Sequence, residues 1–441
     1  METAAGSATA INFAHGPDFA HGLWAATCAE PAPEAAPLQG AAETQVAIIG
    51  AGYLGLSTAL ALAENGVAVT VLEAEAPGHG ASGRNGGQVI PNLRHDTGEV
   101  EAAYGAAAAR PLIEFGRTIA DATFALIARH GIACEAKAAG VVQLRDTEAG
   151  VADARKRMRS LQRMDFPVRW LERQEVRDLL GTAAYQGGFH LQNGGTVQPL
   201  ALSRGLARAA QAAGARLHFA TPATGLARHG AGWRLTTAGG RLDAERVLLA
   251  TNALSGALWP AMQRAIVPVW SYQIATSPVA PGQGPPHGLA MADARRVLRY
   301  FRADAAGRVV VGGKGKWRAP RGMADFRLQR ATLARLYPAL AGAEITHAWG
   351  GTVALTQDRW PRLFTLEEGL IGAIGCNGKG VAWNVAWGRH LAAVLAGAKL
   401  TAQPVPPGPA RAIPLHALKQ VMAAAYGTWL RARDAFDRPL G

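Results

Sequence analysis

Residues 46–73 constrain the fold of this chain more than any other stretch. An apolar run at residues 46–49 leads into Gly50-Ala51-Gly52-Tyr53-Leu54-Gly55, and an apolar helical pattern then ends at Asn65-Gly66. A second apolar run closes on Glu73. This order of strand, glycine turn, helix and strand predicts a dinucleotide-binding βαβ unit. The glycine triplet alone would also fit an ordinary βα turn without a ligand, and it is the flanking strands and helix that favour the nucleotide site.

Each glycine of the triplet has its own steric role. Gly50 permits the tight turn out of the first strand, Gly52 lets the backbone approach a pyrophosphate, and Gly55 lets the helix pack closely on the strand. The first helical turn, with Tyr53 and Leu54, directs its backbone N–H groups at the phosphates. We therefore expect all five residues to contact or shape the nucleotide site.

Glu73 identifies the class of nucleotide. It ends the second strand roughly 20 residues after the glycines, where a carboxylate accepts hydrogen bonds from the ribose hydroxyls. With Ala74 beside it, this carboxylate would repel the 2′-phosphate of NADP. The sequence therefore predicts FAD or NAD.

A glycine-rich polar loop at residues 78–88 favours FAD over NAD. The loop follows the ribose-binding strand and is too polar for a core segment. A flavin ring needs close approach of the backbone and polar donors around it, which an NAD site does not. The loop alone would also fit a flexible surface segment. Its expected FAD-binding residues are Ser82, Arg84, Asn85, Gly86, Gly87 and Gln88, with the side chains of Arg84, Asn85 and Gln88 aimed at the cofactor.

A third glycine cluster lies near the C-terminus and supports the same interpretation. Residues 371–382 follow the pattern strand, glycine turn and helix start, which again predicts an anion site at a helix N-terminus. The expected contacts are Gly375, Asn377, Gly378, Lys379, Gly380 and Val381.

Together these segments resemble the D-amino-acid oxidase-like flavoprotein superfamily, and within it the gamma-glutamylputrescine oxidase-like amine oxidases. The resemblance also rests on Gly194-Gly195 with Gln198-Pro199-Leu200, Ala250-Thr251-Asn252-Ala253, Ala275-Thr276, Tyr300-Phe301-Arg302, Gly312-Gly313, Trp349-Gly350-Gly351 with Thr356, and the tail around Tyr426 and Arg433-Asp434. It implies a mixed α/β fold, with a Rossmann-like FAD-binding domain of the glutathione-reductase type and an inserted antiparallel-sheet substrate domain. It further implies that FAD is held noncovalently and that Ala223, Ala250, Thr251 and Asn252 contact it.

The chain departs from the family pattern at positions that concern the substrate. Lys379 replaces a usual His, Lys314 and Lys316 stand where small or apolar residues are common, Gln198 replaces a frequent His, and Arg299 replaces an acid. A cation near a flavin stabilises its anionic reduced form. We therefore expect Lys379, Lys314, Lys316, Arg299 and Arg302 to form a cationic roof that favours an amine carrying a carboxylate.

The composition of the chain argues against a nucleic-acid-binding protein and against a membrane protein. The net charge of +13 could indicate nucleic acid, but the arginines are scattered and are not interleaved with stacking aromatics. The densest basic patch, Arg155-Lys156-Arg157 with Arg159 and Arg163, is typical of a solvated helix face. No apolar run reaches 18 residues and no signal peptide is evident, so a cytoplasmic protein without a membrane span is expected.

Cysteine usage predicts neither a disulfide framework nor a metal site. Cys28, Cys134 and Cys376 are scattered without CxxC spacing. Cys376 lies inside the third glycine cluster, but the resemblance places a tethering cysteine well before it. Cys376 is expected to be a packing residue.

The pattern of segments predicts a discontinuous two-domain chain. The FAD-binding domain is expected at residues 44–98, 196–254 and 348–403, and the substrate domain at 99–195 and 255–347. Residues 1–43 would form an arm anchored by Trp24, and 404–441 a linker and C-terminal helix. Helices are expected at 102–131, 147–164 and 201–213, and strands at 140–144, 216–220, 232–236, 247–250, 265–277, 297–302 and 309–313.

The leading functional hypothesis is an FAD-dependent oxidoreductase that oxidises the C–N bond of an amine or amino acid, with oxygen or another acceptor reoxidising the flavin. Three alternatives stay open: a tRNA-modifying flavoprotein of the same superfamily, an amino-acid dehydrogenase with a respiratory acceptor, and a noncatalytic flavin-binding protein. Nothing in the sequence predicts an oligomeric state.

Overall fold

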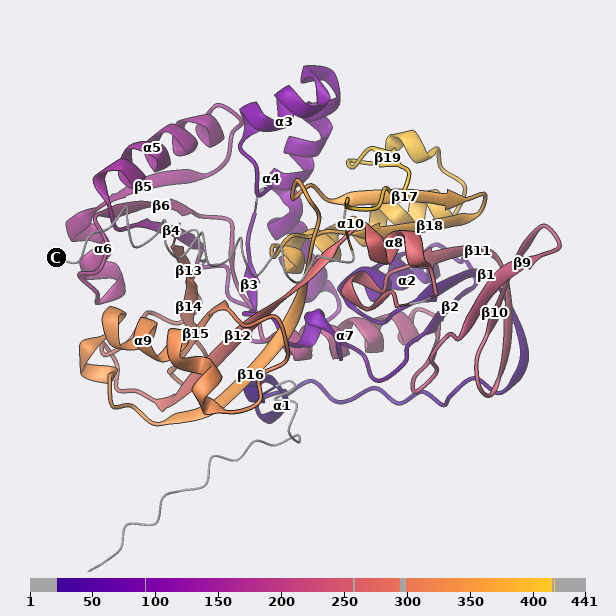
Figure 1. Cartoon of the computed structure of the whole chain (residues 1–441), viewed down its shortest axis with the longest axis horizontal. Helices are drawn as coiled ribbons and strands as arrows, with labels where there is room; N and C mark the ends of the chain where they lie inside the picture. The colour runs from indigo at the N-terminus through magenta and orange to yellow at the C-terminus, as the bar shows by residue number, and fades with distance from the viewer. Residues whose placement is uncertain (1–21, 92, 257, 294–298, 415, 417–441) are drawn as a thin grey trace, which may run out of the picture.

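The computed structural model describes residues 22–91, 93–256, 258–293, 299–414 and 416. Two large β-sheets occupy opposite halves of an elongated molecule, and the chain passes between them several times (Figure 1). The C-terminal helix expected up to residue 436 lies outside the described residues.

The first sheet is the predicted Rossmann-like sheet. Its main path runs β19-β17-β18-β11-β1-β2-β8, and β10 and β9 branch from β11. The pairs from β18 to β8 are all parallel. The strands are β1 (Gly40–Ile49), β2 (Val69–Leu72), β8 (Arg216–His218), β9 (Gly225–His229), β10 (Gly232–Thr236), β11 (Gly240–Leu249), β17 (Arg362–Glu367), β18 (Leu370–Ile374) and β19 (Pro407–Gly408).

Helix α2 (Tyr53–Glu64) packs against this sheet and against α7 (Pro199–Ala212) and α10 (Gly380–Leu395). Its apolar residues are buried because neighbours cover it on several sides. The contact with α10 is close, since a Cβ on Gly388 would lie 2.5 Å from the side chain of Ser57. Helix α4 (Ala106–Arg129) covers α10 from outside.

The second sheet has the order β16-β12-β15-β14-β13-β4-β6-β5. Only the pair β13 and β4 is parallel, so the predicted antiparallel character is confirmed. The strands are β4 (Val141–Arg145), β5 (Val168–Glu172), β6 (Gly187–Leu191), β12 (Val267–Pro278), β13 (Ala290–Asp293), β14 (Arg299–Ala303), β15 (Arg308–Lys314) and β16 (Ile345–Leu355). Helices α5 (Glu148–Gln162), α6 (Arg173–Leu180) and α9 (Arg327–Leu336) pack on it.

The expected helix at 102–131 is broken into two. Helix α3 (Thr97–Tyr104) ends at Gly105, whose φ of 76° cannot continue a helix, and α4 starts after it. A capping box between Asp96 and Glu99 starts α3 at Thr97, ahead of the helix start expected at residue 102.

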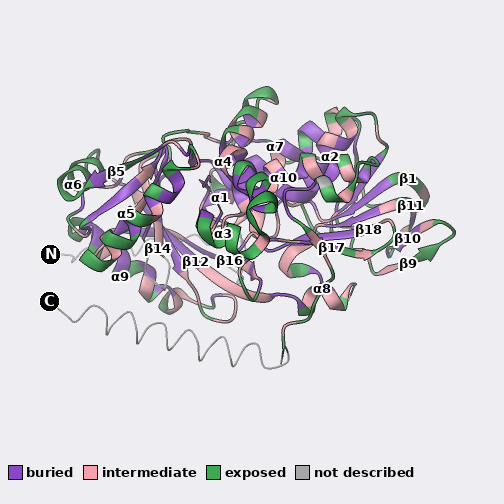
Figure 2. Cartoon of the chain, turned by 90° about the horizontal axis from the view of Figure 1, so that it is seen from above, coloured by how far each residue is buried: buried purple, intermediate pink, exposed green. Residues whose placement is uncertain are grey.

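Short elements tie the two halves together. They are α1 (Gly22–Ala26), α8 (Pro260–Arg264) and the ribbon of β3 (Gln88–Val89) with β7 (Gly195–Thr196). Trp24 on α1 is fully buried, and its Nε1 donates to the carbonyl of Asn85 at 2.8 Å. The predicted anchoring role of Trp24 is confirmed. Figure 2 shows buried residues along the strands of both sheets, with exposed residues on the outer faces of α5 and α6.

Candidate active site

One cavity of about 1010 Å³ is lined by residues of both sheets. The first sheet contributes the β1–α2 turn and the end of β2, and the second contributes side chains of β4, β12, β13, β14 and β16. The loops at residues 78–86, 250–256 and 375–380 complete the wall. The three glycine clusters of the sequence, more than 300 residues apart at their extremes, therefore meet around a single space.

The β1–α2 turn is shaped by steric limits that only glycine meets. Gly50 has a φ of 109°, and a Cβ there would lie 3.0 Å from the carbonyl oxygen of Ala250. A Cβ on Gly55 would lie 2.0 Å from the carbonyl oxygen of Gly50. Gly50 and Gly52 line the cavity, whereas Gly55 lies outside its lining. The geometry therefore gives Gly55 a packing role and leaves the approach to a ligand to Gly50 and Gly52.

Glu73 lies at the cavity end of β2, with Ala74 next to it. Its Oε2 accepts the backbone N–H of Ala51 at 2.6 Å, and its Oε1 accepts that of Glu75 at 3.1 Å. Burial raises the pKa of the Glu73 carboxyl, and these hydrogen bonds act in the opposite direction. The carboxylate is thus fixed in place before any ligand arrives.

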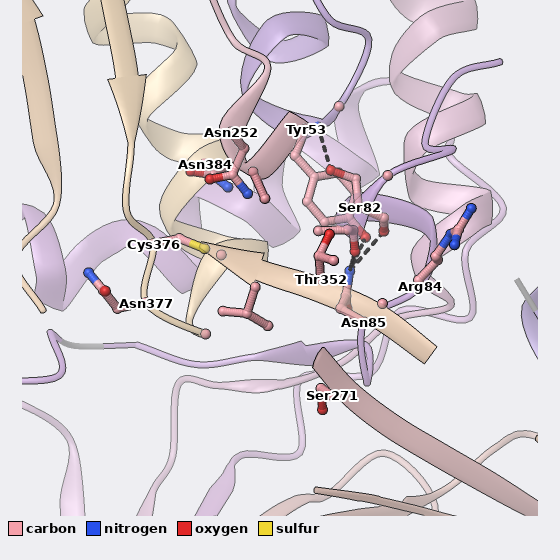
Figure 3. Close-up of a pocket in the computed structure, with 18 of the residues that line it drawn as sticks. Tyr53, Ser82, Arg84, Asn85, Asn252, Ser271, Thr352, Cys376, Asn377 and Asn384 are labelled. Atoms are coloured by element: carbon pink, nitrogen blue, oxygen red, sulfur yellow. Dashed lines mark hydrogen bonds between the residues drawn. The ribbon is translucent and has the colours of Figure 1, made fainter. Parts of the chain in front are cut away.

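The loop after β2 is held by its own side chains (Figure 3). The Oγ of Ser82 accepts the N–H of Tyr53 at 3.0 Å, at the start of α2. The Asn85 amide donates to the carbonyl of Ser82 at 2.8 Å, and its Oδ1 accepts the N–H of Gly87 at 2.7 Å. These contacts fix the path of the loop along the cavity.

The side chains of Arg84, Asn85 and Gln88, which we expect to face the cofactor, also form hydrogen bonds within the protein. Arg84 Nε donates to the carbonyl of His79 at 2.7 Å, and Gln88 Nε2 donates to that of Met291 at 3.0 Å. All three line the cavity, but their polar ends brace the protein. These bonds satisfy carbonyls of the loop and of the second sheet, and the contacts of the three side chains with the cofactor stay a prediction.

The second sheet closes the loop from the other side, which the sequence did not reveal. Gln273 Nε2 and Trp349 Nε1 both donate to the carbonyl of Arg84, at 2.6 and 3.0 Å. A Cβ on Gly86 would lie 2.7 Å from the ring of Tyr300. Gln273 and Tyr300 line the cavity, so β12 and β14 reach the loop directly.

The residues expected near the adenosine and in the C-terminal loop also lie at the cavity. Those that line it are Ala223, Ala250, Thr251, Asn252, Gly375, Asn377, Gly378, Lys379, Gly380 and Val381. Asn377, buried and with a φ of 50°, shapes the C-terminal loop, because its Oδ1 accepts the N–H of Thr356 at 3.0 Å. Cys376 lines the cavity here, and burial raises the pKa of its thiol.

Lys379 is the most perturbed of the expected cations. Lys379 lies directly before α10, and its Nζ donates to the carbonyl of Leu93 at 2.8 Å. Burial, with the nearby charges of Arg157 and Arg94, holds the pKa of the Lys379 amine well below its usual value. Lys314 also lines the cavity, with its Nζ 4.9 Å from the ring centroid of Trp317.

The expected cationic roof is only partly present. Lys316 pairs with Asp325 at 2.5 Å and does not line the cavity. Arg299 also lies outside the cavity lining, and its backbone N–H donates to Asp293 at 3.3 Å.

The expected place of Arg302 in the cationic roof is wrong, because its side chain lies behind the cavity. Its side chain is fully buried and donates to the carbonyls of Val197 at 2.6 Å and Gly87 at 3.0 Å. Its guanidinium also lies 5.3 Å from the centroid of the Trp24 ring. Arg302 and Tyr300 lie two residues apart on β14 and leave the same face of the strand, but Tyr300 packs on Gly86 and lines the cavity, whereas Arg302 reaches the buried backbone around Gly87. Arg302 therefore joins the loop, the arm and the second sheet.

Three further arginines line the cavity in addition to Arg84 and Arg359. Arg94 follows β3, Arg145 ends β4 and Arg157 lies on α5. We call these three with Lys379 the arginine wall. The assignment of Arg157 to a solvated helix face was wrong, because Arg157 lies one turn from the buried Ala154 and its Nη2 donates to the carbonyl of Arg94 at 2.8 Å. The one signal for the wall in the sequence was the position of Arg157, three residues after Ala154 on an amphipathic helix.

The residues at the cavity fit FAD. The β1–α2 turn lines the cavity with Gly50 and Gly52, where a Cβ would press on the Ala250 carbonyl and on Ser82 Oγ, and Glu73 is fixed at the ribose position. The Oε1 of buried Gln273 has no hydrogen-bond partner among the described residues. An elongated nucleotide with a flat ring system matches a cavity that runs from this turn to the second sheet.

Comparison with known proteins agrees with this geometry. Residues 45–394 match the family model described as FAD dependent oxidoreductase (DAO), and the chain belongs to this family. It is 33% identical over 348 residues to a probable oxidoreductase OrdL of Rhizobium meliloti, covering 78% of this chain and 81% of that one. It is 30% identical over 399 residues to the gamma-glutamylputrescine oxidoreductase of Escherichia coli, covering 86% and 91%.

A solved glycine oxidase from Geobacillus kaustophilus has the same fold. It superposes with a TM-score of 0.72 at 22% identity, over 83% of this chain and 98% of that one. The chain is thus an FAD-dependent oxidoreductase, and the resemblance to gamma-glutamylputrescine oxidase-like proteins is confirmed. In the part of the chain that the structure describes, no helix combines the length and apolar character needed to cross a membrane. Within the same residues, no cluster of three or more His, Cys, Asp and Glu side chains could hold a metal ion.

Proposed function

We propose that this protein oxidises the C–N bond of an amine or amino acid that carries a carboxylate. The observation that carries the proposal is that a single cavity joins the dinucleotide turn to a basic wall of the second sheet. One end of this cavity suits the cofactor, and the other suits an anionic substrate. Oxidoreductases of related sequence act on such molecules, since gamma-glutamylputrescine is an amine with a carboxylate.

The charge of the cavity supports the choice of substrate. Its basic lining residues are Arg84, Arg94, Arg145, Arg157, Lys314, Arg359 and Lys379, against the acidic Glu73 and Asp293. A polyamine with two positive charges would meet repulsion here, whereas a carboxylate gains attraction in a partly dehydrated space. A buried lysine with a lowered pKa, Lys379, adds a group that can change its proton state near the cofactor.

FAD supplies the redox chemistry by accepting a hydride from the carbon next to the amine nitrogen, which leaves an imine that water hydrolyses to an aldehyde or keto acid. The protein then has to place the amine and exclude competing reactions. The side chains of Gln273, Tyr300, Ser271 and Thr352 line the second-sheet side of the cavity and can position the substrate. A strong general base is not required, provided that the amine enters neutral.

The experiment is anaerobic mixing of the purified yellow protein with a panel of amines and amino acids while the flavin absorbance is followed. We expect amino acids, N-alkyl amino acids or gamma-glutamyl amines to reduce the flavin faster than putrescine does. Fastest reduction by putrescine or spermidine would refute the carboxylate preference, and no reduction by any of these compounds would refute amine oxidation. Admitting oxygen afterwards and assaying H₂O₂ separates an oxidase from a dehydrogenase. Tight, salt-dependent tRNA binding would instead support the tRNA-modifying alternative.

A further inference from the structure

The arginine wall is the basic part of the cavity on which the proposed carboxylate preference rests. Its four side chains come from separate segments: Arg94 after β3, Arg145 on β4, Arg157 on α5 and Lys379 before α10. Backbone carbonyls order three of them. Arg157 donates to that of Arg94, Lys379 to that of Leu93, and Arg145 to that of Leu144 at 2.9 Å.

Two of these cations are placed at an electrostatic cost. Arg145 is only 7% exposed, and neither Arg145 nor Arg157 forms an ion pair with any carboxylate of the described residues. Burial and the nearby Arg157 charge lower the pKa of Arg145 to about 10. A buried charge of this kind requires several kcal/mol of compensation, which backbone carbonyls supply only in part.

The acidic groups around the wall are engaged elsewhere. Asp96 and Glu99 cap α3 by accepting each other's backbone N–H, and Asp146 pairs with Arg335 at 3.2 Å. Asp153 is exposed on α5. Of the acids whose charges act on Arg145 or Arg157, only Asp293 lines the cavity. The wall therefore keeps an excess of positive charge on its cavity side.

We propose that Arg145 and Arg157, flanked by Arg94 and Lys379, form the subsite that binds the anionic group of the substrate, and that this group is a carboxylate. The planar guanidinium groups of two arginines match the geometry of a carboxylate, and a cation from each neighbouring segment surrounds it. This inference rests on the proposed function, and it moves the substrate-selecting charge from the expected roof at Arg299 and Arg302 to β4 and α5.

The test is binding of a carboxylate that cannot be oxidised. Glutarate is titrated into the FAD-loaded protein by calorimetry, with its neutral diamide, glutaramide, as the matched ligand. The variants are Arg145→Gln, Arg157→Gln and, as a control of equal charge loss, Arg155→Gln. Arg155 lies two residues from Arg157 on α5 but pairs with Glu172 on the outer surface. Bound FAD and the melting temperature are measured for each variant to verify folding.

We expect glutarate to bind the wild type more tightly than glutaramide, and each cavity variant to weaken glutarate binding about tenfold or more. Arg155→Gln should leave that affinity within about twofold, because an exposed charge is screened. Equal binding to all proteins, equal loss in the Arg155 control, or no glutarate binding to the wild type would overturn the subsite. If Arg145→Gln fails to fold, Arg157→Gln and the charge-retaining Arg145→Lys still decide the question.

This experiment separates the subsite from the reaction. Glutarate binding does not depend on turnover, so a protein that reduces its flavin with amines but ignores the wall variants refutes the subsite alone. A protein that binds glutarate at the wall but oxidises no amine refutes the proposed function alone.

Discussion

The two ends of the cavity are built in different ways. At the βαβ end, residues 46–73, backbone atoms and absent side chains make the surface, as at Gly50, where a Cβ would lie 3.0 Å from the Ala250 carbonyl. At the arginine wall, long side chains from four separate segments make it. A glycine turn depends on local geometry and can be predicted from the sequence. The arginine wall forms only when the second sheet and α5 are folded. The predictions below test this difference, beginning with the largest effect.

Gly55→Ala should be the most damaging single change, because the new Cβ would lie 2.0 Å from the carbonyl oxygen of Gly50. Helix α2 would have to move away from β1, at a cost of about 1–3 kcal/mol or more. The purified protein should melt at a lower temperature and contain little FAD. Gly342→Ala is the control, since nothing lies within 4 Å of its added Cβ. A fully flavinated, stable Gly55→Ala protein would mean that close packing does not build this end.

Arg302→Met should reduce stability rather than chemistry. The carbonyl of Val197 would lose its donor, while that of Gly87 keeps the backbone N–H of Val197 at 2.8 Å, and a buried unsatisfied group costs about 1–3 kcal/mol. We expect the free energy of unfolding to fall by about 2 kcal/mol or more in denaturant titrations, with kcat/KM per bound flavin retained. Exposed Arg241→Met serves as the control. A large loss of kcat at unchanged stability would restore Arg302 to the catalytic roof.

Glu73→Gln should weaken retention of FAD by about tenfold, because a charge-assisted hydrogen bond to the ribose becomes a neutral one. The change keeps the size of the side chain, and FAD affinity is measured by fluorescence titration of the apoprotein. Exposed Glu75→Gln controls for the loss of one negative charge. Identical affinity in wild type and Glu73→Gln would show that the βαβ end is misinterpreted.

The buried amine of Lys379 should make the free energy of unfolding depend on pH. The pKa of its amine in the folded protein lies well below the usual pKa of a lysine, so between these two pKa values the unfolded chain binds more protons than the folded one. The contribution of Lys379 to stability therefore rises with pH in this window, by up to about 1.4 kcal/mol per pH unit. Lys379→Met should lack this rise when unfolding is measured from pH 7 to pH 10. Parallel curves for both proteins would place the amine in solvent.

The substitution Cys376→Ser should have the smallest effect of these changes. Burial raises the pKa of its thiol, which disfavours the reactive thiolate, so we expect FAD to be held noncovalently. Acid precipitation should release all flavin from the wild type and from Cys376→Ser alike. Flavin that stays with the wild-type pellet but leaves the variant would identify a covalent bond.

The sequence predicted the order of the elements at the βαβ end, and their positions agree with the structure within a few residues, except that β1 begins at Gly40 and not at residue 46. The first sheet is parallel from β18 to β8 and the second is largely antiparallel, as the family resemblance implied. Gly105 was the exception, because one glycine with positive φ divided a continuous amphipathic pattern into α3 and α4. The exact division of the chain into domains stays a prediction, since β16 runs across position 348 into the second sheet.

What the sequence determined by itself was the fold class, the cofactor class and the glycines and Glu73 that shape its site, because these depend on spacing along a short stretch of chain. Tertiary structure alone decided which charges face the cavity. Arg302 and Arg157 look alike in sequence, yet β14 turns Arg302 toward buried carbonyls and α5 turns Arg157 toward the cavity. The direction of a long charged side chain depends on what packs against its element, and that information is distributed over residues hundreds of positions apart.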